Sequence, residues 1–114
     1  MGRLLTVFLL LFSIPALAVD IDALRAKAMK GDYQAQRNLA FGYATGDQGI
    51  KKNHSLACAW YLLILRSDSP KLGSGDVGNV SVYCDPFKPG FGPDERLVSE
   101  RQANELYRKI YLEN

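Results

Sequence analysis

The sequence offers few of the side chains that catalysis or metal binding requires. His54 is its only histidine, and Cys58 and Cys84 are its only cysteines. A catalytic triad needs a nucleophile, a base and a group that orients the base, whereas a structural zinc site usually needs four nitrogen or sulfur ligands. Because His54 has no such partners at a recognisable spacing, we predict no catalytic residues, no metal site and no cofactor.

Two other patterns look functional but lack the context that the function needs. Residues 73–78 have the glycine spacing G-x-G-x-x-G, which binds a dinucleotide only where a strand precedes it and a long helix follows. Neither is expected here, so we interpret the segment as a loop. Asp94, Glu95 and Glu100 lie in the first turns of an expected helix, where acidic side chains interact favourably with the helix dipole. We therefore assign these carboxylates no catalytic role.

The composition is that of a small globular protein. The chain has 114 residues, of which 47% are hydrophobic and 23% are charged, and its formal net charge is +2. This length allows a single domain. Nucleic-acid-binding proteins usually carry a marked excess of basic residues, so the small net charge gives no reason to expect a nucleic-acid partner.

Residues 1–18 have the features of a secretory signal peptide. Arg3 provides a positive start, residues 4–12 form an apolar run broken only by Thr6, and residues 16–18 are Ala-Leu-Ala. The run is too short for a transmembrane helix, which needs about 20 residues. We predict cleavage after Ala18, one domain over residues 19–114, a periplasmic or secreted location, and no membrane insertion after cleavage. The alternative is an N-terminal membrane anchor that is never cut.

An exported location changes the interpretation of the two cysteines. Cysteine pairs in an oxidising compartment commonly form disulfides, whereas in the cytosol they usually stay reduced. We therefore predict a disulfide between Cys58 and Cys84. The alternative is a pair of buried thiols.

Hydrophobic periodicity predicts an all-α fold. Apolar residues recur at helical spacing, and Asp20, Asp32 and Asn53 are suitable N-cap residues. The segment 67–78 is rich in Ser, Gly, Asp and Pro and is predicted to be loop, while 79–85 is ambiguous between a strand and one or two helical turns. The expected helices cover about 20–30, 33–45, 54–67 and 94–112.

The helix expected over 54–67 contains a stretch, 56–65, without a charged side chain. A helix that is apolar on all sides is buried on all sides, so we expect it at the centre of the fold. Ile50 is expected to place its side chain under the preceding turn. The two central helices should pack through Ala35, Leu39 and Tyr43 on one side and Ala57, Trp60, Tyr61 and Ile64 on the other.

A set of small, aromatic and turn residues recurs in a defined order between positions 28 and 61. Its members are Ala28, Gly31, Asp32, Ala35, Gln36, Leu39, Ala40, Tyr43, Gly46, Gly49, Ile50, Asn53, Ala57, Trp60 and Tyr61. This pattern resembles the Sel-one-like repeat, a relative of the tetratricopeptide repeats, which have about 34 residues and a helix–turn–helix structure. The resemblance implies an α/α hairpin over about 28–67, a fragment of a right-handed superhelix, with flanking capping helices. It resembles the small exported bacterial members, although Ala40 replaces the usual glycine and no second full repeat follows.

The resemblance also implies a ligand-binding surface. In tetratricopeptide-like folds, one stripe of the first helix of each repeat lines a concave groove. The matching stripe of the helix over 33–45 consists of Gln34, Arg37, Phe41, Ala44 and Thr45, and arginine and aromatic side chains are common interface anchors. The alternative is that the helix over 20–30 packs on this stripe and buries Phe41.

These features predict an exported module for protein–protein interaction that binds a protein or peptide partner and is not an enzyme. A dedicated inhibitor or immunity-type protein for a toxin or hydrolase is one alternative. A cell-envelope enzyme is another, with less support from the residues. The sequence does not identify the partner.

Overall fold

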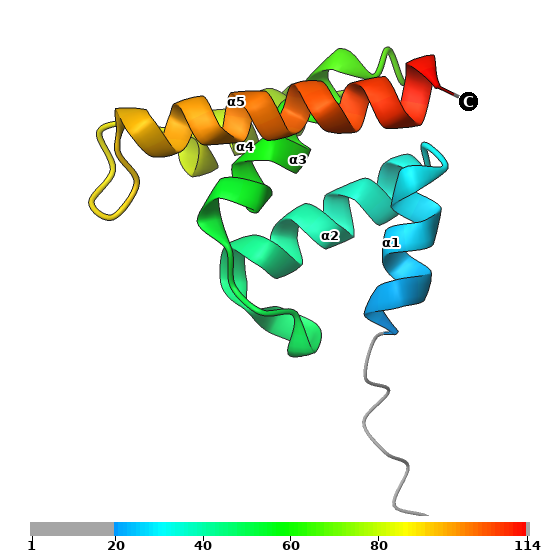
Figure 1. Ribbon diagram of the computed structural model, residues 1–114, viewed down its shortest axis with the longest axis horizontal. Coiled ribbons are helices and arrows are strands. Elements are labelled where there is room, and N and C mark those ends of the chain that lie inside the picture. The colour runs from blue at the N-terminus through cyan, green and yellow to red at the C-terminus, as the bar shows by residue number, and fades with distance from the viewer. Residues whose placement is uncertain (1–19, 114) are drawn as a thin grey trace, which may run out of the picture.

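The computed structural model describes residues 20–113, and in this range it contains helices and no strand. The predicted all-α class is therefore confirmed. The predicted signal peptide lies outside the described residues. The helices are α1 (Ile21–Met29), α2 (Tyr33–Thr45), α3 (His54–Arg66), α4 (Ser74–Tyr83) and α5 (Pro93–Tyr107), which continues as a π-helical segment over Arg108–Leu112 (Figure 1).

The first three helices begin where their capping residues predict. The side chains of Asp20, Asp32 and Asn53 each accept hydrogen bonds from backbone N–H groups in the first turn that follows. These bonds satisfy donors that a helix cannot satisfy internally. The bounds of α1, α2 and α3 therefore agree with the expected helices to within about one residue.

The turn after α2 depends on a close contact between Gly42 and Ile50. The Ile50 side chain is 2% exposed, as its position in an otherwise polar turn predicted. It lies so near Gly42 that a Cβ atom at this position would overlap Ile50 Cδ1. The helix then ends at Gly46, which has the left-handed φ of 77° that glycine adopts without strain.

Helix α3 forms the centre of the fold, as its uncharged sequence predicted. All residues from Ala57 to Ile64 are buried, because α3 packs against α2, α4 and α5. Figure 1 shows α5 on one side of α3 and α2 on the other, with α4 partly hidden behind α5. The residues predicted to join α2 and α3 are all buried in one core: Ala35, Leu39, Tyr43, Ala57, Trp60, Tyr61 and Ile64.

A second buried cluster joins α3 to α4, α5 and the loop between them. The predicted disulfide between Cys58 and Cys84 is present here, with Cα atoms 5.0 Å apart. Both cysteines are fully buried, together with Phe91 and Ala103. The disulfide attaches the end of α4 covalently to the central helix.

Helix α4 corrects the prediction of a loop over 67–78. The helix begins at Ser74 and also resolves the ambiguous segment 79–85 as helical to Tyr83. The glycines at 75 and 78, which suggested a loop, face open space. Two anchors override their weak helix propensity: the Asp76 carboxylate accepts a hydrogen bond from Gly73 N–H at 3.0 Å, and Cys84 is joined to α3.

The C-terminal end of the chain contacts the N-terminal helices through Gln36. Its amide nitrogen donates to the backbone oxygen of Ala28 at 3.1 Å and to the Tyr111 hydroxyl at 3.2 Å. On the exposed side of the last helix, Lys109 and Glu105 form an ion pair at 3.2 Å. Among residues 20–113, no helix is long and apolar enough to cross a membrane.

Candidate binding groove

A groove of about 350 Å³ runs between α2 and α4, with α3 beneath it. Its walls combine hydrogen-bonding and aromatic side chains and include no carboxylate. They are Gln34, Arg37, Asn38 and Phe41 of α2, Tyr61 of α3, and Asn79 and Tyr83 of α4. Three of the five residues predicted to bind a ligand, Gln34, Arg37 and Phe41, therefore line one concave surface.

The two remaining predicted residues do not line the groove. Ala44 is only 6% exposed and belongs to the hydrophobic core, so its assignment to the binding stripe is wrong. The reason is that α1 and α3 both pack against α2, which widens the buried side of α2 beyond the seam with α3. Thr45 is exposed at the end of α2, where its hydroxyl donates to the backbone oxygen of Phe41 at 2.8 Å.

Phe41 is the largest apolar side chain on the groove. It is 45% exposed, so α1 does not bury it, and this alternative from the sequence is wrong. An aromatic side chain next to polar walls is a common anchor for a binding partner. Phe41 is therefore available to contact a ligand.

Arg37 is held in place by a buried carboxylate of α4, behind the opposite wall of the groove. Its Nε lies 3.5 Å from Oδ1 of Asp76, and its guanidinium carbon lies 5.6 Å from the centre of the Tyr33 ring. The Tyr33 hydroxyl in turn donates to Asp76 Oδ2 at 2.6 Å. These contacts fix the position of the Arg37 side chain through its Nε.

Asp76 is a residue that the sequence analysis missed. It is 2% exposed, and besides Tyr33 and Arg37 it contacts the N–H of Gly73 at the start of α4. The signal that could have identified it is its spacing, because an acidic residue three positions after a helix start often bonds back to the first turn. The glycines around Asp76 predicted a loop instead of a helix.

Two tyrosines form the aromatic part of the groove. The rings of Tyr61 and Tyr83 stack with centres 5.0 Å apart and planes inclined by 13°. Burial, assisted by Tyr83, raises the pKa of Tyr61 to about 12, while the charge of Arg37 acts in the opposite direction. The pKa of Tyr33 is also raised, first by burial and then by its hydrogen bond to Asp76. Arg37 and Tyr61 both line the groove.

Amide side chains provide further hydrogen-bonding groups. Gln34 Nε2 donates to Asn38 Oδ1 at 2.9 Å, and both side chains are exposed on α2. This bond uses neither the Gln34 carbonyl oxygen nor the amino group of Asn38. The opposite wall adds the side chain of Asn79. Donors and acceptors are therefore available on both sides of the groove.

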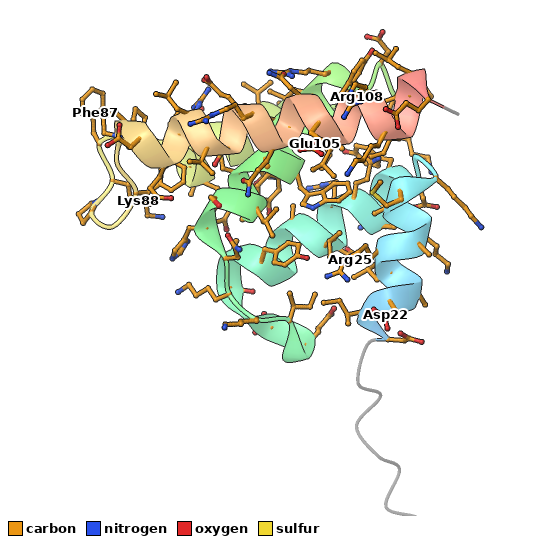
Figure 2. The ribbon with its side chains drawn as sticks, in the orientation of Figure 1. Asp22, Arg25, Phe87, Lys88, Glu105 and Arg108 are labelled. Atoms are coloured by element: carbon orange, nitrogen blue, oxygen red, sulfur yellow. A yellow bond between two sulfur atoms is a disulfide. The ribbon has the colours of Figure 1, made fainter. Side chains whose placement is uncertain are left out.

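A small cavity of about 20 Å³ adjoins the groove at Tyr83 and extends toward the loop before α5. It is lined by His54 and Lys88 among others, and Lys88 Nζ lies 5.7 Å from the centre of the Tyr83 ring. Figure 2 shows Lys88 and the exposed Phe87 on this loop. Lys88 thus adds a second positive charge beside the stacked tyrosines.

The lining of the groove consists of amide, guanidinium, phenol and phenyl side chains. Both cysteines are in the disulfide, and His54 lies at the start of α3 on the small adjoining cavity. Within residues 20–113 no cluster of histidine, cysteine and carboxylate side chains could hold a metal ion. The arrangement can accept hydrogen bonds, donate them, and contact an apolar or negatively charged group. No protein-family model, no curated protein and no solved structure matches the chain.

Proposed function

We propose that the protein is an exported binding module that takes a peptide segment of a partner protein into the groove between α2 and α4. The observation that carries the proposal is the half-exposed Phe41 beside the fixed guanidinium of Arg37. Large aromatic and arginine side chains contribute much of the binding energy in protein interfaces. Ligand sites also commonly combine aromatic side chains with a few polar groups that fix the orientation of the ligand.

We also propose that the hairpin of α2 and α3 is one Sel-one-like repeat. Small buried residues support this, because Ala35, Ala40 and Ala57 allow close approach at the interface of the two helices. In this interpretation α4 supplies the second wall of the groove, and α1 and α5 cap the hairpin. A single repeat otherwise lacks the neighbours that stabilise repeat proteins.

Export through residues 1–18 is part of the same proposal. The disulfide between Cys58 and Cys84 supports it, because such bonds persist in oxidising compartments. Fractionation followed by intact-mass measurement tests it. We expect a chain that begins at Val19 in the periplasm or the medium, whereas a full-length chain in the membrane pellet would contradict export.

Site-specific photo-crosslinking tests the binding surface. A photoreactive residue at Asn38, which is exposed on the groove wall, should crosslink to one partner protein. The same residue at Arg101, exposed on α5 and outside the groove, is the control. The crosslink from position 38 should disappear when Phe41→Ala is combined with it. Equal crosslinking from both positions would contradict the groove as the binding site.

The identity of the crosslinked partner separates the adaptor function from the inhibitor function. A toxin or hydrolase whose activity falls when the protein binds would establish a dedicated inhibitor. A partner that has no such activity would favour an adaptor. Both outcomes depend on the same groove.

A further inference from the structure

We infer that the ligand of the groove is an extended, acidic segment of a partner protein, in which an acidic residue lies two positions from an apolar one. The inference rests on the proposed function, since it specifies what the peptide-binding groove accepts. Three features of the groove carry it: its charge, its amide side chains and the spacing of Arg37 and Phe41.

The charge of the groove favours an acidic ligand. No aspartate or glutamate lines the groove or the small cavity that adjoins it, whereas Arg37 lines the first and Lys88 the second. Asp76 contacts Arg37 through Nε, and the Arg37 side chain, which is 37% exposed, lines the groove. A guanidinium forms strong hydrogen bonds with carboxylates.

The amide side chains suit the backbone of an extended peptide. Gln34 and Asn38 bond to each other at 2.9 Å and together present one acceptor and one donor. An extended peptide has backbone N–H and C=O groups without internal partners, and such a pair can satisfy one of each. Asn79 offers the same chemistry from the opposite wall.

The spacing of the two anchors matches an extended chain. Arg37 and Phe41 are four residues apart on one helix, which is a rise of about 6 Å. In an extended peptide, alternate side chains point to the same side and are about 6.6 Å apart. A peptide whose acidic side chain pairs with Arg37 therefore places its own residue two positions along the chain near Phe41. An apolar side chain suits that place, because Phe41 and Tyr83 both line the groove.

A random peptide library tests the inference. We propose nine-residue random segments displayed between Gly-Ser linkers, so that no chain terminus competes for Arg37. Selection on the wild-type protein should enrich Asp or Glu two positions from an apolar residue. Selection on Arg37→Gln should lose the acidic preference, while the charge-matched control Arg101→Gln on α5 should retain it. Lys88→Gln, on an exposed loop, gives a second charge change without risk to the core.

Binding of one selected peptide, synthesised with capped ends, measures the effect. Glu→Gln in the peptide should weaken binding about tenfold at low salt, and higher ionic strength should reduce this difference. Arg37→Gln should remove most of the preference for Glu over Gln, provided that its circular dichroism equals that of the wild type.

The possible outcomes separate the ligand class from the function. Enrichment of peptides without acidic residues would overturn the acidic ligand and leave the peptide-binding groove supported. Enrichment no greater on the wild type than on Phe41→Ala would overturn both. Retention of the acidic preference in both Arg37→Gln and Lys88→Gln would also overturn the inference, because the charge would then be recognised elsewhere.

Discussion

Arg37 of α2 and Asp76 of α4 connect the two walls of the groove, with Nε of the arginine 3.5 Å from Oδ1 of the carboxylate. The carboxylate is buried, while the Arg37 side chain is 37% exposed. Solvent therefore screens the ion pair, and its main effect is on geometry. The position of a groove anchor thus depends on a residue that does not line the groove.

Replacement of Asp76 should weaken the fold and loosen Arg37. Asp76→Asn removes the negative charge that accepts hydrogen bonds from Tyr33 and Gly73 and pairs with Arg37. We expect a loss of about 1–3 kcal/mol in the free energy of unfolding. Tyr33→Phe removes one of these hydrogen bonds and should cost about 1 kcal/mol. Urea denaturation measures both. Equal stability of Asp76→Asn and the wild type would show that the buried carboxylate makes no net contribution to the free energy of unfolding.

Phe41→Ala should separate binding from stability. Because Phe41 is about half exposed, its truncation should change the free energy of unfolding by less than about 1 kcal/mol. Binding of the partner should weaken by about 1–3 kcal/mol. Leu39→Ala, two residues earlier and fully buried, should instead destabilise the fold by about 2–5 kcal/mol. A similar loss of stability in both variants would contradict the exposure of Phe41.

Loss of the disulfide should remove a large share of the stability. Cys58 and Cys84 are 26 residues apart, and closure of such a loop stabilises by about 3.5 kcal/mol in the chain-entropy model. Domains of this size have a total of about 5–15 kcal/mol. Urea denaturation with and without a reductant measures the difference, and a variant with both cysteines changed to alanine should not respond to the reductant. Thiol titration of the unfolded, unreduced protein should detect no reactive group.

Two helical glycines should respond to alanine with opposite sign. At Gly42 a Cβ atom meets Ile50, so Gly42→Ala should destabilise by about 1–3 kcal/mol. At Gly78 nothing lies within 4 Å, so Gly78→Ala should stabilise by about 0.5–1 kcal/mol through its higher helix propensity. Thermal denaturation of the two variants checks this. The prediction fails if both substitutions shift the midpoint in the same direction.

Tyr61 should make stability depend on pH in the alkaline range. Its pKa is raised from 10.0 to about 12, mainly by burial, so the folded state favours the neutral phenol. This contribution, roughly 2–3 kcal/mol, is fully present below pH 10 and is lost as the pH rises through about 12. Ultraviolet titration should show a tyrosine that ionises near pH 12, and Tyr61→Phe should remove that step. Ionisation of every tyrosine near pH 10 in the folded protein would contradict it.

The helices that the sequence predicted well are those whose signals are local. Asp32 and Asn53 cap their own helices, and the uncharged stretch of α3 requires burial whatever surrounds it. Helix α4 was missed because its stability comes from distant residues. Cys58 holds its end and Tyr33 contacts Asp76, and neither contact can be recognised from the glycine-rich segment itself.

The binding stripe was predicted in part for a similar reason. The spacing of Gln34, Arg37 and Phe41 places them on one face of α2, and they do line the groove. Ala44 lies at the edge of that face, so its burial depends on how far the neighbouring helices extend around α2. The opposite wall, with Asn79 and Tyr83, lies in the segment that the sequence left ambiguous.

The disulfide secures one wall of the groove. Cys84 follows the last residue of α4, the helix that supplies Asn79 and Tyr83 to the groove. Before oxidation, this wall is held to α3 by non-covalent contacts alone. We therefore expect this wall of the groove to be less ordered in a reduced chain than in an oxidised one.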